Sequence, residues 1–210
     1  MSIYTKEFKE AISLLPSEEK DKLILRLLKK DLLLAKKLYF ELVEGDIEAR
    51  RTEMEKQIIE RVKNLNSNFS SIGYLNMHVR YLSGDITQHV KITKDKYGEV
   101  SLNLLLLIEV LRKNREKILT GYPPVKQHKF TTSIIARTFK ILLLINKMKE
   151  DLLLDFKEDL KTLGELIADN AVLMETAITN GLDVNWLIRA EIPEDIESIH
   201  KELKSLGFLK

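Results

Sequence analysis

Residues 99–115 read EVSLNLLLLIEVLRKNR, and this apolar stretch indicates the class of fold. Its apolar positions do not alternate with polar ones, so it favours a helix over a half-buried strand. Its longest uninterrupted apolar run, residues 104–108, is far shorter than the roughly 20 residues that a membrane-spanning helix needs. We therefore expect a core helix and no membrane partner.

Outward from this stretch, apolar residues recur at helical spacing along nearly the whole chain. Of the 210 residues, 44% are hydrophobic, and only 8 are glycine and 4 are proline. Such a composition is too apolar for disorder and too poor in glycine and proline for a turn-rich sandwich or barrel. The predicted fold class is all-α: a single domain over residues 1–210, built as an irregular bundle of about ten helices.

Capping residues place the helix ends near the start of the chain. Pro16 ends a first helix, Asp31 caps a third, and Gly45 supplies a left-handed residue at its end. In the middle of the chain, Gly84 and Gly98 predict breaks between helices.

The strongest loop signal is TGYPP at residues 120–124, where two adjacent prolines forbid a continuing helix. As an alternative to one undivided domain, two subdomains divide near residue 121. Beyond this loop the sequence predicts one helix from about residue 129 to 148 and a second from residue 151 toward 179. Asn180 and Gly181 are expected to end the second helix.

Residues 14–31 read LLPSEEKDKLILRLLKKD, and the pattern closes at Gly45. This pattern, over residues 11–45, resembles one helical hairpin of the HEAT-like repeat proteins, in which two antiparallel helices meet at a corner that contains Asp. The resemblance implies a scaffold of stacked hairpins, so a short HEAT-like α-solenoid is the alternative architecture. KKDLLL at residues 29–34 has a loose echo in KEDLLL at residues 149–154, but no fixed period of 30 to 50 residues connects them.

The chain lacks the sequence motifs of the common enzyme and metal-binding classes. It contains no cysteine, no glycine-rich phosphate loop and no serine-hydrolase elbow. Only His200, one of four histidines, has a glutamate three positions before it, Glu197, whereas a di-iron bundle needs two such pairs. We therefore expect no metal and no cofactor.

One helical face leaves a catalytic alternative open. Tyr74, His78 and Tyr81 share a face at offsets of three and four, and Arg80 lies beside them, so this face either packs in the core or lines a partly polar pocket. An enzyme would use this pocket. Asp85 and His89, four residues apart, are placed to form a local ion pair.

The charge distribution is uneven although the net charge is only +2. Residues 71–150 carry 14 Lys and Arg against 6 Asp and Glu, whereas residues 151–210 carry 6 against 13. The basic region 112–149 is therefore a candidate surface for nucleic acid or another polyanion. Its candidate residues are Arg112, Lys113, Arg115, Lys117, Lys129, Arg137, Lys140 and Lys147.

The ordinary explanation for the two charged regions is that they pair with each other. Lys129, Arg137, Lys140 and Lys147 form one helical stripe, and Asp151, Asp155, Glu158, Glu165 and Asp169 form another. Two consecutive antiparallel helices would bring such stripes together. Association between copies of the chain is the second explanation.

The leading functional hypothesis is a non-catalytic cytoplasmic helical protein that presents helix faces to a protein partner or to another copy of itself. The absence of cysteine suits a reducing compartment. The alternatives are a polyanion-binding protein that uses the basic region and an enzyme that uses the tyrosine-lined pocket.

Overall fold

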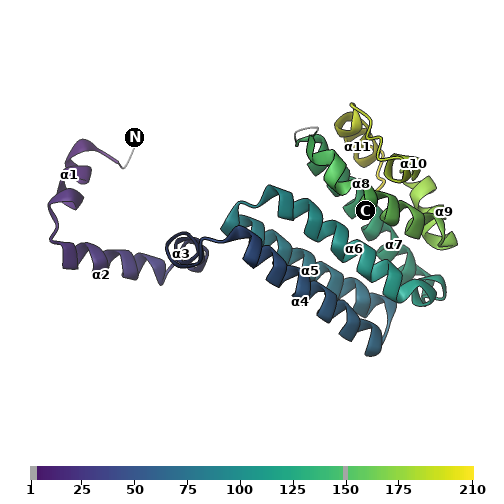
Figure 1. Cartoon of the computed structure of the whole chain (residues 1–210), viewed down its shortest axis with the longest axis horizontal. Coiled ribbons are helices and arrows are strands. Elements are labelled where there is room, and N and C mark those ends of the chain that lie inside the picture. Colours follow the sequence, from purple (N-terminus) through teal and green to yellow (C-terminus); the bar gives the residue numbers. More distant parts are fainter. Residues whose placement is uncertain (1–3, 149–150) are drawn as a thin grey trace. The chain divides into compact units, whose positions relative to one another are not determined.

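The computed structural model describes residues 4–148 and 151–210. Within these residues there are eleven α-helices, one π-helical turn and no strand (Figure 1). The elements are α1 (Lys6–Leu14), α2 (Ser17–Leu28), α3 (Leu32–Tyr39), η1 (Phe40–Glu44), α4 (Ile47–Ser67), α5 (Ile72–Thr93), α6 (Lys96–Leu119), α7 (Pro124–Asn146), α8 (Asp151–Ala168), α9 (Ala171–Thr179), α10 (Asn185–Ile188) and α11 (Ile196–Ser205). The predicted all-α multi-helix fold is confirmed. The HEAT-like alternative stays a prediction.

Contacts between Cα atoms group the chain into two units. The first unit contains the chain up to Asp46 together with Lys91–Thr93, and the second contains Ile47–Val90 and Lys94–Lys210. The alternative of two subdomains that divide near residue 121 stays a prediction. Residue 121 itself lies in the second unit, in the loop that joins α6 and α7, which pack against each other.

The second unit is organised around α6, the helix that contains the apolar stretch quoted above. This helix packs against α4, α7, α8 and α9. Contacts with several neighbours explain why Leu102, Leu104, Leu106, Leu107 and Ile108 are all buried although they point in different directions around the helix. A helix that is apolar on every side is stable in water only when other helices surround it.

The surrounding helices each bury one face, as their sequence periodicity predicts. On α5 the buried residues Ile72, Leu75, Val79, Leu82 and Ile86 follow one another at steps of three and four. The same steps separate Phe156, Leu160, Leu163 and Ile167 on α8. These apolar faces and α6 form a single hydrophobic core.

Several predicted helix ends are confirmed. The Asp31 side chain accepts a hydrogen bond from the backbone nitrogen of Leu34 at 3.0 Å and so caps α3. Gly45 has φ +65° at the end of η1, and its nitrogen donates to the Phe40 carbonyl oxygen at 2.8 Å. Gly181 has φ +71° after α9.

The predicted breaks at Gly84 and Gly98 are wrong. Helix α5 continues through Gly84, and Gly98 lies in the first turn of α6, which Asp95 caps. The long helix predicted from residue 151 toward 179 is also wrong, because it consists of α8 and α9. Asn170 separates them and caps α9 by accepting a hydrogen bond from the Leu173 nitrogen at 3.2 Å.

Candidate functional site

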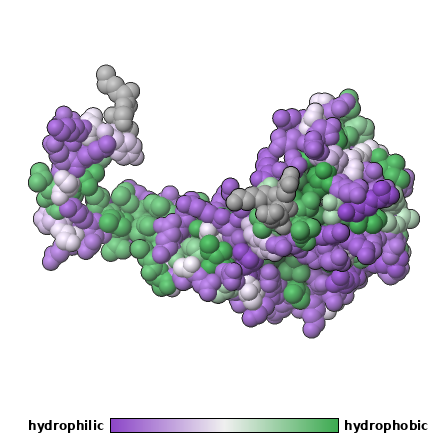
Figure 2. All heavy atoms as spheres, turned by 45° about the horizontal axis from the view of Figure 1, so that its top comes forward, coloured by the Kyte–Doolittle hydropathy of each residue, from purple (hydrophilic) through white to green (hydrophobic). Residues whose placement is uncertain are grey.

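The helices of the first unit expose most of their apolar side chains. Of the 21 large hydrophobic side chains that are exposed in the described residues, 12 lie before Asp46. None of α1, α2 and α3 contains a buried residue. The exposed set includes Phe8, Ile12, Leu14, Ile24, Leu25, Leu27, Leu32, Leu34, Tyr39, Leu42 and Val43, which we call the N-terminal apolar surface. Figure 2 shows hydrophobic side chains gathered over this part of the chain.

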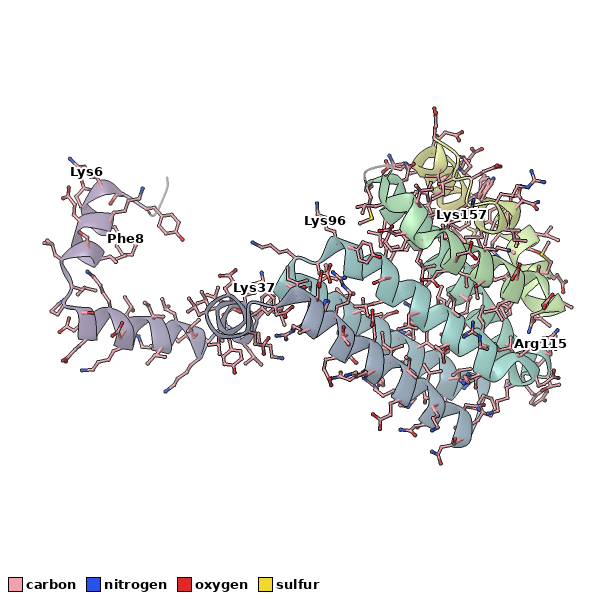
Figure 3. The ribbon with its side chains drawn as sticks, viewed as in Figure 1. Lys6, Phe8, Lys37, Lys96, Arg115 and Lys157 are labelled. Carbon is pink, nitrogen blue, oxygen red and sulfur yellow. The ribbon has the colours of Figure 1, made fainter. Side chains whose placement is uncertain are left out.

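Local sequence explains why these segments form helices that nevertheless lack a core. Thr5 caps α1 by accepting a hydrogen bond from the nitrogen of Phe8, which Figure 3 labels, at 3.3 Å. Phe8 and Ile12 are four residues apart and therefore share one face of the helix. On α2, Ile24 is 49% exposed and Leu25 is 60% exposed. The apolar faces of amphipathic helices are therefore present, but nothing in the first unit buries them.

Of the four predicted cations on α6, three donate hydrogen bonds to other protein groups and the fourth is exposed to solvent. Arg112 donates to Glu109 Oε1 at 3.1 Å, and Lys113 is exposed. Arg115, which is labelled in Figure 3, donates to the Asp169 carbonyl oxygen at 3.1 Å. Lys117 donates to Asn66 and lies 4.8 Å from the centre of the Phe69 ring.

The predicted cations on α7 have different surroundings. Lys129, Arg137 and Lys140 line one cavity of about 340 Å³, whereas Lys147 pairs with Glu197 at 3.2 Å. The cavity also includes Arg80, which the sequence assigned to the tyrosine-lined pocket. We call this cavity the basic pocket; it is lined by Asn76, Arg80, Lys129, Thr132, Ser133, Ala136, Arg137, Lys140, Leu209 and Lys210.

Arg137, which lines the basic pocket, is hydrogen-bonded to α5. Its Nη1 atom donates to Ser83 Oγ, while its Nε atom is buried and has no hydrogen-bond partner among the described residues. Burial lowers the pKa of Arg137, and the positive charge of Arg80 lowers it further. The α5 contribution could not be read from the α7 sequence alone, because α5 lies about 50 residues earlier in the chain.

The tyrosine-lined face of α5 divides between two cavities. Tyr74 and His78, whose ring centres are 4.3 Å apart, line a cavity of about 220 Å³ together with Arg61 and neighbouring residues of α4. The Tyr81 ring lies 5.8 Å from the His78 ring and is 55% exposed. Arg80 belongs to the basic pocket, so the structure does not bring the four predicted residues together.

Acidic and basic residues meet in a buried cluster that the sequence did not reveal. The two carboxylate oxygens of Asp95 accept hydrogen bonds from Arg51 Nε at 2.7 Å and Arg51 Nη2 at 2.9 Å, and Oδ1 also accepts from the Gly98 nitrogen at 2.8 Å. His89 Nε2 lies 3.4 Å from Asp95 Oδ2. The predicted pair between Asp85 and His89 is therefore wrong, because Asp85 pairs with Arg61.

This cluster shifts the pKa values of its members. Burial alone would raise the pKa of Asp95, but the hydrogen bonds from Arg51 and from the Gly98 nitrogen, with the Arg51 charge, lower it overall. Burial lowers the pKa of His89 despite the neighbouring carboxylate. The geometry is that of a helix cap combined with an ion pair, and its position at the start of α6 gives it a structural role.

The predicted pairing between the stripes of α7 and α8 is not what the structure shows. Lys140 of α7 binds Glu99 of α6 at 3.0 Å, and Lys147 binds Glu197 of α11 at 3.2 Å. Helix α8 packs instead against α6, α9 and α10. Residues 149 and 150, where the predicted basic region ends, lie outside the described residues.

Two further features are absent from the described residues. No group of three or more His, Asp or Glu side chains is arranged to hold a metal ion there. None of the helices in this range combines the length and the apolar character that crossing a membrane requires. Comparison with models of protein families, with curated proteins and with solved structures finds no match to this chain.

Proposed function

We propose that this chain is a cytoplasmic, self-associating helical protein whose N-terminal apolar surface binds the same surface of a second copy. The observation that carries the proposal is the concentration of exposed apolar side chains before Asp46. A concentration of exposed apolar side chains of this kind is typical of protein interaction sites.

The short length of the N-terminal helices supports the presence of a partner that packs against them. Helices α1, α2 and α3 contain 9, 12 and 8 residues, and isolated helices shorter than about 12 to 15 residues are marginal in water. Most helical stability in proteins comes from packing of an apolar face. A partner that covers the N-terminal apolar surface would supply this packing.

Charge favours a second copy as that partner. Residues 1–46 contain nine Lys and Arg and nine Asp and Glu, so two copies meet without net repulsion. A two-fold interface brings the same surface of each copy together, so that surface must be complementary to itself. A segment with equal numbers of positive and negative side chains meets this requirement. The same balance disfavours an anionic membrane surface, because amphipathic helices that bind such membranes have a basic polar face.

Light scattering and sedimentation of the full chain over a range of concentrations test the proposal. The wild-type protein is expected to form a dimer or a higher oligomer. Phe8→Glu and Leu25→Glu are expected to shift it to the monomer, because a buried, unpaired carboxylate would oppose association. Both side chains are exposed within the chain, so circular dichroism is expected to show an unchanged core.

Leu154→Glu is the matched control for Leu25→Glu. Leu154 lies on α8 and is 74% exposed, so this substitution replaces an exposed leucine outside the N-terminal apolar surface. It is expected to leave the oligomer intact. A wild-type protein that is monomeric at every concentration would overturn the proposal, as would an oligomer that only Leu154→Glu dissociates.

A further inference from the structure

We propose that the basic pocket between α5 and α7 binds a phosphate group, either free or as part of a small phosphomonoester. The proposal is independent of self-association, since every residue of the basic pocket lies in the second unit. It rests on a cluster of cations, most of them without carboxylate partners, and on the buried, unpartnered hydroxyl group of Thr132, a residue that lines the same cavity.

Several positive charges are gathered in this pocket, and most of them have no acidic partner. Among the described residues, Arg80, Lys129 and Arg137 have no carboxylate within ion-pair distance. Only Lys140 of the described lining cations has such a partner, Glu99, at 3.0 Å. Cations held together in this way repel one another, so a bound anion would be stabilised by all of them.

Two hydrogen-bonding atoms of the pocket residues also lack partners among the described residues. Thr132 is 4% exposed, and its Oγ1 atom has no hydrogen-bond partner within the described part of the chain. A buried hydroxyl without a partner costs free energy, and a ligand oxygen in the pocket would satisfy it. The Nε atom of Arg137 is likewise buried and has no hydrogen-bond partner within the described part of the chain.

Other contacts hold the pocket residues in place. Arg137 Nη1 is fixed by Ser83 Oγ, and the Nε atom of the same guanidinium is buried without a partner. Ser133 Oγ donates to Asn76 Oδ1 at 3.0 Å and so ties α7 to α5. Fixed donors lose little conformational entropy when they bind an anion.

The geometry favours a small phosphorylated molecule over a nucleic acid strand. The cavity of about 340 Å³ is within the range of small-molecule sites. Arg guanidinium groups match the oxygens of a phosphate in pairs, and hydroxyl donors such as Thr132 add a further contact. A nucleic acid would need a continuous basic track, but Arg112, Arg115 and Lys117 on α6 bond to other protein groups.

Isothermal titration of the full chain with inorganic phosphate and with ribose 5-phosphate tests the proposal at constant ionic strength set by chloride. One saturable site per chain is expected. Arg80→Gln and Arg137→Gln are each expected to weaken binding by about tenfold or more. Tighter binding of ribose 5-phosphate identifies a phosphomonoester as the ligand, whereas equal binding identifies the phosphate group alone.

Thr132→Val separates a binding role from a structural one. The substitution replaces an unpartnered buried hydroxyl with a methyl group of similar size, so the melting temperature is expected to stay unchanged or rise. Phosphate affinity is nevertheless expected to fall by about fivefold. Unchanged affinity together with unchanged stability would count against the proposed site.

Lys113→Gln is the matched control for the loss of one positive charge, since Lys113 is exposed on α6 away from the basic pocket. It is expected to leave phosphate affinity unchanged. Absence of saturable phosphate binding would overturn the proposal. An equal loss of affinity in Lys113→Gln and Arg80→Gln would also overturn it, as would binding of a single-stranded oligonucleotide without binding of phosphate.

Discussion

Arg51 holds both carboxylate oxygens of Asp95, with Nε donating at 2.7 Å and Nη2 at 2.9 Å. Arg51 lies on α4 and Asp95 is the N-cap of α6, so this paired contact joins two helices that are far apart in sequence. The Asp95 side chain is 3% exposed and that of Arg51 is 19% exposed. A shielded, two-bonded contact of this kind is more rigid than a single bond between exposed side chains.

Asp95→Ala is expected to destabilise the second unit by about 3 kcal/mol, because it removes a helix cap and leaves the Arg51 charge shielded and unpaired. Unfolding in urea, followed by circular dichroism, measures the change. Asp169→Ala removes a carboxylate that is exposed, and it is expected to change stability by no more than about 0.5 kcal/mol. Similar losses in the two variants would contradict the role given to Asp95.

Two helical glycines are expected to respond in opposite directions to alanine. A Cβ atom on Gly98 would overlap Asp95 Oδ2 and lie 3.0 Å from Arg51 Nε, so Gly98→Ala is expected to disrupt the cap and lower the melting temperature. A Cβ atom on Gly84 would meet nothing within 4 Å. Gly84→Ala is expected to stabilise the protein by about 0.5 to 1 kcal/mol, since alanine favours a helix.

Thermal unfolding of both variants measures these effects. A gain in stability in Gly98→Ala would show that the cap accommodates a methyl group, contrary to the close approach of Asp95. A loss in Gly84→Ala would show that the exposed surface of α5 at this position is covered in solution.

Four positions show where reasoning from the sequence succeeds and where it fails. Local rules identified Gly45 and Asp31 correctly, because a left-handed residue and a cap depend on immediate neighbours. Those rules also predicted breaks at Gly84 and Gly98, but packing of the neighbouring apolar residues carries α5 through Gly84. Position 98 requires glycine because the side chains of Asp95 and Arg51 leave no room for a Cβ atom. Local rules could not predict this, since Arg51 lies 47 positions away in the sequence.

The candidate site was predictable only in part for the same reason. Charge counting selected Lys129, Arg137 and Lys140, which the basic pocket contains. It could not separate them from Lys147, which lies on the same helix but pairs with Glu197. The unpartnered hydroxyl of Thr132 and the participation of Arg80 depend on tertiary packing of α5 against α7, which no local pattern encodes.

Acid is expected to weaken the fold through His89. Burial lowers its pKa in the folded protein below the ordinary value of about 6.5, so the unfolded chain binds a proton first as the pH falls. The stabilisation is complete above about pH 6.5 and is lost as the pH falls toward the folded pKa, by at most about 1.4 kcal/mol per pH unit. Asp95, whose pKa is lowered, adds a separate loss only below about pH 3.8.

His89→Gln removes this titration while the other histidines remain. The difference in unfolding free energy between the wild type and His89→Gln is expected to shrink between pH 7.5 and pH 5. Because His200 is present in both proteins, its own lowered pKa cancels in the difference. A difference that grows toward low pH would mean that Asp95 stabilises a protonated His89 in the folded state.

Gly164→Ala is expected to displace α10 from α8. A Cβ atom at Gly164 would lie 2.8 Å from Ile188 Cγ1 and 3.1 Å from the Ile188 backbone nitrogen, so a side-chain rotation alone cannot make room for it. The expected loss is about 1 to 3 kcal/mol, reduced by the helix preference of alanine. The chain's single tryptophan, Trp186, lies on α10 and is half-buried, with its ring centre 6.5 Å from that of Phe139.

Fluorescence of Trp186 therefore reports the displacement directly. In Gly164→Ala the emission maximum is expected to move to longer wavelength, because the ring gains contact with water as α10 shifts. In Gly84→Ala, the same substitution on an open helix surface, the emission is expected to stay unchanged. A raised melting temperature and unshifted emission in Gly164→Ala would mean that α8 and α10 are not in close contact in solution.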